Sequence, residues 1–598
     1  MDPDSRRGGG RMNTYAIDFE TEYSKTLSIP IQGVYRYIRE ADIYMVSIVG
    51  PDIEWVGHPQ ECPHWDALVG AHLIAHNMSF DGAILNHLME RGQIPQGVGS
   101  GGMDCTADMA VYFQGPRNLA GACKQLLGNY DAIDKSMRSY MKGRQWHEVT
   151  EPQRGMMLEY ALKDSLACMA LWNQWQEAWP QWEKELSQHN RTMAWRGVNV
   201  DSELAKEYQD TLERVRWESE QEIPWTNDTD KILSREWFDI ECRRVGLTPP
   251  KSLAKTDDDA TAWFEAHRDL HPFITAVGTW RQSNTLLAKV ETLNNGIRDD
   301  GRYTPTLKYY GAAVTGRYSG DAGFNMQNLP RDPIQGVDLR KVFIPSPGNK
   351  FVVVDLSQIE PRCMAWYVDD EKMLNMLRDG YPLYEAHARA TMGFDGPKGS
   401  LKENKELDDV YRLAKAQILG LGYMCGAPRF VEMAWTLARL RITLEKSKET
   451  VKQFRKDNPL ITDLWSNCDQ WLKAAAATDR ELTLDLPSGR EIRYFDLDRI
   501  GGMKSSVTRG DEKKYFQYGG KTAENIIQGM ARDVMCAAIL RIEKAGYPVV
   551  FHVHDEVICD VPMDTEVQTI IDLMTTVPEW AEGLPVDAAG FETQYYKK

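Results

Sequence analysis

Four carboxylates and one tyrosine in the N-terminal part of the chain have spacings that suit metal-assisted hydrolysis. Asp18 and Glu20 are two residues apart in the alternating run YAIDFETE, so both side chains leave one face of an expected strand. Asp81 follows an apolar approach in AHNMSFDGAIL, and Tyr160 and Asp164 lie four residues apart on an expected helix. Hard divalent cations prefer such oxygen ligands. The set predicts two Mg²⁺-type ions about 4 Å apart, with Tyr160 orienting the attacking water.

A second group of carboxylates is predicted near the other end of the chain. The run FHVHDEVICD places Asp555 and Glu556 between two apolar runs that we expect to form paired strands. FVVVDLSQIEPR indicates a buried strand that ends at Asp355 and turns into a helix. We expect Asp355 and Asp555 to hold two cations jointly, with Glu556 nearby. Such a centre suits phosphoryl transfer, in which a 3′-hydroxyl attacks an α-phosphate and pyrophosphate leaves.

The stretch YRLAKAQILGLGYMCG (411–426) carries cations and a ring at helical spacing. At 100° per residue, one sector of about 80° holds Arg412, Lys415, Leu419 and Tyr423. The cations suit a triphosphate, and the ring and apolar side chain suit packing against a base pair. Periodicity alone favours a simpler interpretation, an amphipathic surface helix with a snorkelling lysine. Single carboxylates on strand ends are likewise most often solvated.

Three zones must position these groups, and 598 residues are enough for about three or four domains. Residues 12–180 open with a strand pattern and close with a helical one, residues 185–295 are mostly helical, and residues 300–598 mix both. Ten cysteines form no CxxC pair, which favours reduced thiols in a cytosolic compartment over a zinc ribbon. No apolar run of about 18 residues occurs, so no transmembrane helix is expected.

The charge of the chain is uneven. A net charge of −17 speaks against binding to nucleic acid, whose phosphates attract Lys and Arg. Whole-chain charge says little about a local groove, however. Between Arg281 and Lys341 there are nine Lys or Arg and six Asp or Glu residues. This stretch is a candidate phosphate-facing surface, and an ordinary solvated face fits the same count.

Two ordered sets of motifs resemble known families. DxE, NxxFD and YxxxD, which contain Asp18, Asp81 and Tyr160, resemble the motifs of DEDD exonucleases with an RNase H-like fold. The tyrosine indicates the DEDDy type, which removes nucleotides 3′ to 5′. DLSQIEPR, the stripe from Arg412 to Tyr423, and VHDE resemble motifs A, B and C of family A DNA polymerases. TGRYSG, NMQNLP, LPSGR and GGKTAENIIQGMARD also look like that family, particularly its DNA polymerase I-like phage and prophage branch.

The resemblance implies a multidomain protein of the α/β and α+β classes, with an RNase H-like exonuclease domain before a right-hand polymerase. The implied segments are a flexible N-terminus (1–11), the exonuclease domain (12–182), the thumb (183–300), the first part of the palm (301–365), the fingers (366–500) and the second part of the palm (501–598).

The resemblance also assigns roles to single residues. Two Mg²⁺ ions per active site, with Mn²⁺ as an alternative, are expected on the palm ligands Asp355, Leu356 and Asp555, and on the exonuclease ligands Asp18, Glu20, Asp81 and Asp164. Glu556 assists near the primer end. The residues expected at the incoming nucleotide are Arg412, Lys415, Leu419, Tyr423, Gln358, Tyr384 and the steric gate Glu360, which excludes a 2′-hydroxyl. The residues expected at DNA are Arg317, Asn325, Gln327, Asn525, Gln528 and His554.

Four positions depart from the family pattern. Leu419 stands where many relatives carry Phe or Tyr, which implies poor use of dideoxy terminators. Pro382 and Tyr384 occupy the place of an Asp-x-His pattern, so Tyr384 is the donor left for phosphate there. Met424 replaces the usual glycine after the motif B tyrosine.

The expected function is template-directed DNA polymerisation in replication, with 3′-5′ proofreading. A catalytically inactive DNA-binding scaffold and a nuclease-only processing enzyme are the alternatives. The expected partners are primer–template DNA and dNTPs, and beyond them a replicative helicase, a primase or a single-strand binding protein. We expect a monomer without membrane contact in the cytoplasm of a bacterial host.

Overall fold

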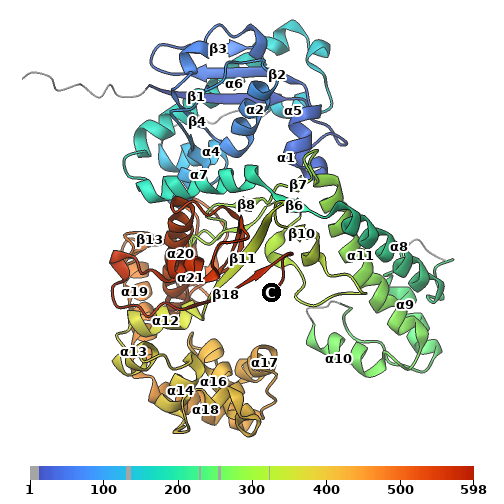
Figure 1. The fold of residues 1–598 in the computed structure, drawn as a ribbon, viewed down its shortest axis with the longest axis vertical. Helices are drawn as coiled ribbons and strands as arrows, with labels where there is room; N and C mark the ends of the chain where they lie inside the picture. The colour runs from blue at the N-terminus through green and yellow to red at the C-terminus, as the bar shows by residue number, and fades with distance from the viewer. Residues whose placement is uncertain (1–12, 129–135, 228–230, 254–256, 322–323) are drawn as a thin grey trace, which may run out of the picture.

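The computed structural model describes residues 13–128, 136–227, 231–253, 257–321 and 324–598. The flexible N-terminus predicted for residues 1–11 lies outside the described residues. No helix in the described ranges is long and apolar enough to cross a membrane. An N-terminal unit, a helical arm and a larger C-terminal unit follow one another from blue to red in Figure 1.

A five-stranded sheet forms the centre of the N-terminal unit, in the order β3-β2-β1-β4-β5. Its strands are β1 (Thr14–Thr21), β2 (Ile43–Val49), β3 (Glu54–Gly57), β4 (His72–Ala75) and β5 (Gly102–Cys105). β1 pairs antiparallel with β2 and parallel with β4. This arrangement agrees with the expected RNase H-like fold. Along β1 the half-buried Asp18 and Glu20 alternate with buried apolar residues, so both carboxylates share one face.

Helices cover this sheet and bring a second segment to its face. They are α1 (Ile29–Glu40), α2 (Met78–Glu90), α3 (Thr106–Tyr112), α4 (Leu119–Leu126), α5 (Ser136–Met141) and α6 (Glu151–Trp175). The long helix α6 packs on β1 and β2. The Ser47 hydroxyl of β2 donates to the Ala161 carbonyl at 2.8 Å. This contact fixes the part of α6 that carries Tyr160 and Asp164 against β1.

The next segment contains a connecting helix and a projecting arm. Its elements are α7 (Gln181–Arg196), β6 (Val198–Val200), α8 (Ser202–Gln221), α9 (Arg235–Arg244), α10 (Asp258–His267) and α11 (Pro272–Gly296). α8 and α11 pack along each other and form the arm at the right of Figure 1. α7 instead packs on strand β16 and helix α20 of the C-terminal unit. The thumb expected for residues 183–300 therefore begins with a helix that does not belong to the arm.

A four-stranded antiparallel sheet, in the order β16-β17-β11-β18, is the centre of the C-terminal unit. Its strands are β11 (Asn349–Leu356), β16 (Val549–Val553), β17 (Glu556–Pro562) and β18 (Ala588–Thr593). Smaller pairings involve β7 (Arg302–Tyr303), β8 (Leu307–Lys308), β9 (Ser319–Gly320) and β10 (Phe343–Ile344). β11 has five consecutive buried residues, Lys350 to Val354, before the half-buried Asp355. The apolar run thus delivers this carboxylate to the strand end.

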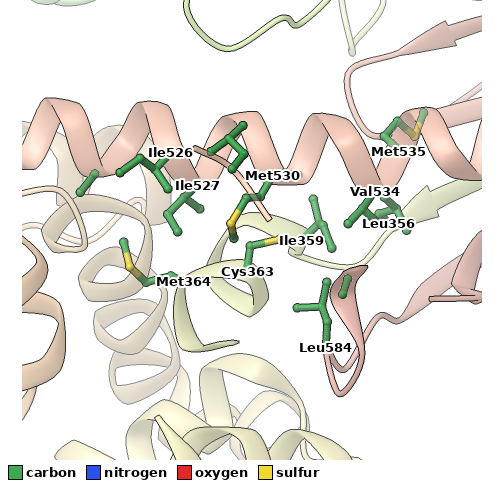
Figure 2. Packing of buried hydrophobic residues seen from close by; sticks show 14 of the residues in the cluster. Leu356, Ile359, Cys363, Met364, Ile526, Ile527, Met530, Val534, Met535 and Leu584 are labelled. Carbon is green, nitrogen blue, oxygen red and sulfur yellow. The ribbon is translucent and has the colours of Figure 1, made fainter. Parts of the chain in front are cut away.

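Helix α12 (Ile359–Tyr367) follows β11 directly and packs against the long helix α20 (Gly519–Lys544). Figure 2 shows the apolar side chains that meet between the two helices, among them Ile359, Cys363, Ile527 and Met530. Full burial of one such side chain contributes roughly 1.5–3 kcal/mol to folding. The packing fixes the turn between Asp355 and α12, and with it the orientation of Glu360.

A group of helices at the bottom of Figure 1 corresponds to the expected fingers. It contains α13 (Glu371–Arg378), α14 (Leu383–Thr391), α15 (Ser400–Glu403), α16 (Asp408–Leu421), α17 (Ala427–Ala438) and α18 (Leu444–Asp457). The next helix of the expected range, α19 (Pro459–Ala477), lies above this group and packs on α20. α21 (Val567–Thr575) covers the central sheet. The helix predicted through Tyr423 ends at Leu421, because Gly422 caps it and Met424 has a left-handed φ of 68°. Tyr423 therefore lies outside the helical stripe.

A second antiparallel sheet, in the order β12-β13-β14-β15, precedes α20. Its strands are β12 (Leu482–Asp485), β13 (Glu491–Asp498), β14 (Lys504–Ser506) and β15 (Tyr515–Phe516). The boundary expected between residues 500 and 501 divides this sheet, since β13 and β14 pair across it. The unit that contains this sheet therefore extends to Phe516, beyond the expected boundary.

One side chain of the N-terminal unit binds this sheet. The Gln114 amide nitrogen donates to the carbonyls of Arg493 (2.9 Å) and Val507 (3.0 Å), and its oxygen accepts from the Arg493 N–H (2.7 Å). The Arg509 N–H also donates to the Gln114 carbonyl at 2.8 Å. Gln114 is 2% exposed and its φ is 53°. It therefore joins the N-terminal unit to the second sheet through main-chain groups.

Buried ion pairs connect α7, α20 and the LPSGR segment. Arg490 bonds to Asp533 at 2.9 Å, and both side chains are fully buried. Arg532 bonds to Glu183 of α7 at 2.6 Å and donates to the Gly316 carbonyl at 3.0 Å. Two buried arginines thereby neutralise two carboxylates, and Arg532 also supports the TGRYSG loop.

We expect the Arg532→Ala substitution to lower the free energy of unfolding by about 3–5 kcal/mol, because it leaves Glu183 buried without its cation. Denaturant unfolding followed by tryptophan fluorescence measures the change. Arg244→Ala is the matched control: Arg244 pairs with Glu241 but is 67% exposed, so its loss should change stability by less than about 1 kcal/mol. Equal effects of the two substitutions would contradict a stabilising role for the buried pair.

Candidate functional site

The N-terminal carboxylates gather where β1 meets α6. Ligand oxygens of Asp18, Glu20 and Asp164 all lie within 4.8 Å of one another. Asp81, in the first turn of α2, is 2% exposed and accepts the Phe19 N–H at 3.1 Å. The structure therefore brings together the four carboxylates that were predicted from three distant segments.

Burial and mutual repulsion control the protonation of this cluster. Burial raises the pKa of Asp18 well above its usual range, and the carboxylates of Glu20, Asp81 and Asp164 raise it further. Burial, followed by Asp164, raises the pKa of Glu20 to about 8, while Arg138 opposes the shift. Burial raises the pKa of Asp81 to about 7, and the hydrogen bond from the Phe19 N–H opposes this shift. Closely spaced carboxylates in a buried site favour either protons or a cation.

The donor set fits a divalent cation. Asp18 Oδ2 is buried and has no hydrogen-bond partner among the described residues. An ion held between Asp18, Glu20 and Asp164 would satisfy this oxygen and remove the repulsion. The Tyr160 hydroxyl is hydrogen-bonded to Asp164, and burial, with that carboxylate, raises the pKa of Tyr160. The tyrosine therefore stays protonated at neutral pH and can donate beside the carboxylates.

A cavity of about 620 Å³ opens in front of this cluster. Besides the carboxylates, it is lined by cationic side chains that include Arg117 and Arg138. Part of its wall comes from outside the N-terminal unit, from Asn190 on α7 and Lys308 on β8. The cavity is thus a composite of two units and has both anionic and cationic walls.

The second group of carboxylates lies at the end of the central sheet. β11 and β17 pair with Asp355 opposite Glu556, and the Leu356 N–H donates to the Asp555 carbonyl at 3.0 Å. Asp355 is about half exposed, whereas Glu556 is buried. The antiparallel register thus brings Asp355 to the tip of the β16–β17 hairpin, as the sequence predicted.

The charge environment of this tip is mixed. Burial raises the pKa of Asp555 to about 6; Arg317 opposes this shift, and Glu360 and Asp355 add to it. The Asp355 and Asp555 carboxylates are a small protein donor set. Mg²⁺ suits such a set, because it retains several waters and takes further oxygens from substrate phosphates.

Two residues at this tip were not found by the sequence analysis. The Tyr596 hydroxyl donates to Glu556 at 2.7 Å, and the Lys598 ammonium lies 3.4 Å from Glu556 and 3.9 Å from Asp355. Both residues follow β18, which pairs with β11. No motif marks them, because only the pairing of β18 brings them to the carboxylates.

Glu360 lies near Asp555 and contacts the residues that follow α16. It forms an ion pair with Arg317, and the Tyr423 hydroxyl donates to its other oxygen at 3.3 Å. Although Tyr423 follows the end of α16, it therefore still reaches the Glu360 side chain. The predicted gate and the predicted aromatic side chain are in direct contact.

The other predicted nucleotide contacts lie on or beside α16. Arg412 pairs with Asp408 at 2.7 Å, and Lys415 and Leu419 are half-buried on the same helix. Tyr384 on α14 packs edge-on against Tyr411 at a centroid distance of 5.7 Å. Gln358 is exposed at the N-cap of α12 with a left-handed φ of 47°.

Three of the residues predicted to contact DNA line one pocket, and a fourth is buried elsewhere. Arg317, Gln327 and His554 line a small pocket of about 30 Å³ together with Asp555. Asn525, in contrast, is 5% exposed and donates to the Tyr494 hydroxyl at 2.8 Å. In this structure the Asn525 amide therefore bonds inside the core, and the DNA contact expected there stays a prediction.

The last two residues predicted to contact DNA form hydrogen bonds with residues close to them in sequence. The Asn325 side chain accepts the Gln327 N–H at 2.9 Å and caps a short helical turn. Gln528 is half-buried and donates to Glu524 at 3.1 Å, one turn away on α20.

Comparison with known proteins identifies a family for the arm and the C-terminal unit. Residues 202–588 match the family described as DNA polymerase family A. The DNA polymerase of Bacillus phage SP02 is 30% identical over 369 residues, which cover 53% of this chain and 56% of that protein. DNA polymerase I of Aquifex aeolicus is 28% identical over 387 residues, which cover 63% and 59%. The chain thus spans less than two thirds of the length of these relatives.

A solved structure shows the same fold. The POL domain of Pol1 from M. smegmatis, in complex with DNA primer-template and dNTP, matches with a TM-score of 0.67 at 19% identity. The match covers 98% of this chain and 96% of that one. Because the family match over residues 202–588 covers more than half of the chain, this chain belongs to DNA polymerase family A.

Proposed function

We propose that this protein is a template-directed DNA polymerase that extends a primer 3′-hydroxyl with dNTPs and proofreads through its N-terminal unit. The observation that carries the proposal is the meeting of Asp355, Asp555, Glu360 and Tyr423 at one end of the central sheet. The relative from M. smegmatis was solved with primer-template DNA and dNTP, which supports the same substrates here.

In the polymerase centre, Asp355 and Asp555 would hold two divalent ions, Mg²⁺ by default and Mn²⁺ as an alternative, with the Leu356 carbonyl. Bound ions supply Lewis acidity for the attacking 3′-hydroxyl and for the leaving pyrophosphate. The Tyr596 hydroxyl holds the buried Glu556 carboxyl beside the hairpin tip. Arg412 and Lys415 bind and orient the triphosphate from α16.

In the proofreading centre, Asp18, Glu20, Asp81 and Asp164 would hold the ions in the same way. Tyr160 donates or accepts one hydrogen bond at the attacking water and so orients it. The cavity of about 620 Å³ gives a frayed 3′ end access to the cluster. Separate sets of carboxylates allow each activity to be removed without the other.

A prediction concerns sugar selection at Glu360. We expect Glu360→Ala to raise the incorporation of ribonucleotides by roughly tenfold or more, since loss of a steric conflict of about 1.4 kcal/mol has that effect. Incorporation of rNTPs and dNTPs into a primer measures the ratio. Glu360→Gln retains the volume and an acceptor for Tyr423, so it should keep most of the selectivity. An unchanged ratio in the alanine variant would remove the gate role.

Primer extension with all four dNTPs, with and without Mg²⁺, on matched and mismatched 3′ ends tests the whole proposal. We expect metal-dependent extension, with removal of the mismatched nucleotide first. Neither reaction would occur in an inactive scaffold, and only degradation would occur in a nuclease-only enzyme. Three further expectations stay predictions. They are a helicase, primase or single-strand binding protein as partner, a monomeric state, and a cytoplasmic location in a bacterial host.

A further inference from the structure

The segment Arg499–Lys521, which contains β14 and β15, concentrates positive charge in an acidic chain. It has six Lys or Arg and two Asp or Glu residues, whereas the whole chain has a net charge of −17. Three of its cations pair with acids outside the segment: Lys514 with Asp498 at 3.8 Å, Lys521 with Glu524 at 3.0 Å and Arg509 with Glu481 at 3.6 Å. Lys504 and Lys513 form no ion pair with a described residue, so their charge faces solvent, and we call the segment the basic aromatic segment.

The same segment exposes large apolar and aromatic side chains. Ile500 is 82% exposed, Phe516 65%, Tyr518 45% and Tyr515 40%. Isolated exposed apolar residues are ordinary, but four of them within one short segment need a reason. Of the family motifs, only GGKTAENIIQGMARD reaches this segment, at its last three residues (519–521), so neither active site explains the four exposed side chains.

Cations lie on the faces of two of these rings. The Lys504 ammonium is 4.8 Å from the centre of the Phe516 ring, and the Lys513 ammonium is 5.0 Å from that of Tyr515. Lys504 and Phe516 are directly opposite in the β14–β15 pairing. A ring beside a cation is the combination that binds a base by stacking and its phosphate by charge.

The basic aromatic segment continues into the polymerase centre. Tyr518 precedes α20, whose first N–H, from Gly519, donates to Asp469 at 2.7 Å. At Gly520 the helix lies so close to the chain that a Cβ would come within 2.4 Å of both the Tyr423 carbonyl and Met424. Tyr423 in turn bonds to Glu360. The exposed rings therefore begin next to the position proposed for the nascent base pair.

We propose that the basic aromatic segment binds the unpaired template strand ahead of the primer end. This inference rests on the proposed polymerase function and names a further subsite for its template. Phe516 and Tyr518 stack on successive bases, while Lys504, Lys513 and Lys514 lie near the phosphates. Stacking tolerates any base, so the subsite is independent of sequence.

Binding of labelled primer–template DNA, measured by fluorescence anisotropy in EDTA, tests this proposal without catalysis. One DNA has a template overhang of about 2 nucleotides and the other one of about 12, within the site sizes typical of single-strand binding surfaces. The native protein should bind the long overhang roughly tenfold more tightly, the effect of about one stacked base. The double variant Lys504→Ala, Phe516→Ala should lose this preference and bind the short overhang as before.

The matched control is a second exposed aromatic ring that has a lysine ammonium on its face. Phe591 is 36% exposed and the Lys597 ammonium is 5.4 Å from its centre, so Phe591→Ala, Lys597→Ala should retain the preference. An unchanged preference in the Lys504, Phe516 variant overturns the proposal, and so does equal binding of both DNAs by the native protein. Weaker binding of the short overhang would assign the segment to the duplex instead.

A third DNA distinguishes the template from a displaced strand. It has a short template overhang and an unpaired 5′ flap of about 12 nucleotides on the non-template strand. Loss of affinity by the double variant for this DNA alone would overturn the template assignment. Extension of the short-overhang primer with Mg²⁺ is measured in parallel: its absence in the native protein refutes the polymerase function, whereas the anisotropy still reports on the segment.

Discussion

Asp355→Ala or Asp555→Ala abolishes primer extension and leaves the degradation of a 3′ end at the rate of the unmodified protein. Each substitution removes one of the two palm carboxylates that would hold the ions between the 3′-hydroxyl and the α-phosphate. Metal ions contribute several kcal/mol to such a transition state, and about 4 kcal/mol corresponds to a thousandfold in rate. Extension should therefore fall by at least about a thousandfold in a single-turnover assay with labelled primer.

The structure provides a matched control for this result. Glu592, on β18 of the same sheet, pairs with Lys350 and is 59% exposed. Glu592→Gln should leave both activities intact. If Asp355→Ala removed extension and degradation together, the two centres would not be independent, or the variant would be misfolded. Thermal unfolding of the variant separates these two cases.

Asp18→Ala abolishes the degradation of a 3′ end and leaves primer extension unchanged. Asp18 belongs to the three-carboxylate group within 4.8 Å, and its Oδ2 has no protein partner among the described residues. Removal of this ligand leaves Glu20 and Asp164 without the geometry for an ion, so we expect a loss of about a thousandfold or more. Hydrolysis of a mismatched, end-labelled primer without dNTPs measures it.

A second measurement on the Asp18 variant is the extension of primers with a mismatched 3′ end. With all four dNTPs, the variant should extend mismatched primers without first trimming them. Asp52→Ala is the control: Asp52 accepts a hydrogen bond from Tyr15 at 2.8 Å within the same unit and does not line the cavity. Degradation that survives in the Asp18 variant would place the nuclease centre elsewhere.

Local patterns predicted much of the fold around both centres. The buried run before Asp355 and the alternation around Asp18 follow from the period of a strand, and both strands occur as expected. The strands around Asp555 pair as the expected hairpin. These features depend on residues close together in sequence, where periodicity is informative.

The failures have physical reasons. Helical periodicity continued through Tyr423, but a glycine and a left-handed Met424 end α16 two residues earlier. The DNA contact of Asn525 stays a prediction: in this structure its amide bonds to Tyr494, because α20 is buried around most of its circumference. Tyr596 and Lys598 reach Glu556 through a strand pairing that no local pattern encodes.

The contact of Gln114 with the second sheet has a consequence for sequence variation. Its amide binds peptide groups of residues 493 and 507, and no side chain of the sheet takes part in these bonds. Mutational drift at those two positions can therefore change size or charge while the joint persists. A single substitution at residue 114 removes three hydrogen bonds between the two units. Substitutions at residues 493 and 507 leave these bonds in place, because only their main-chain groups take part.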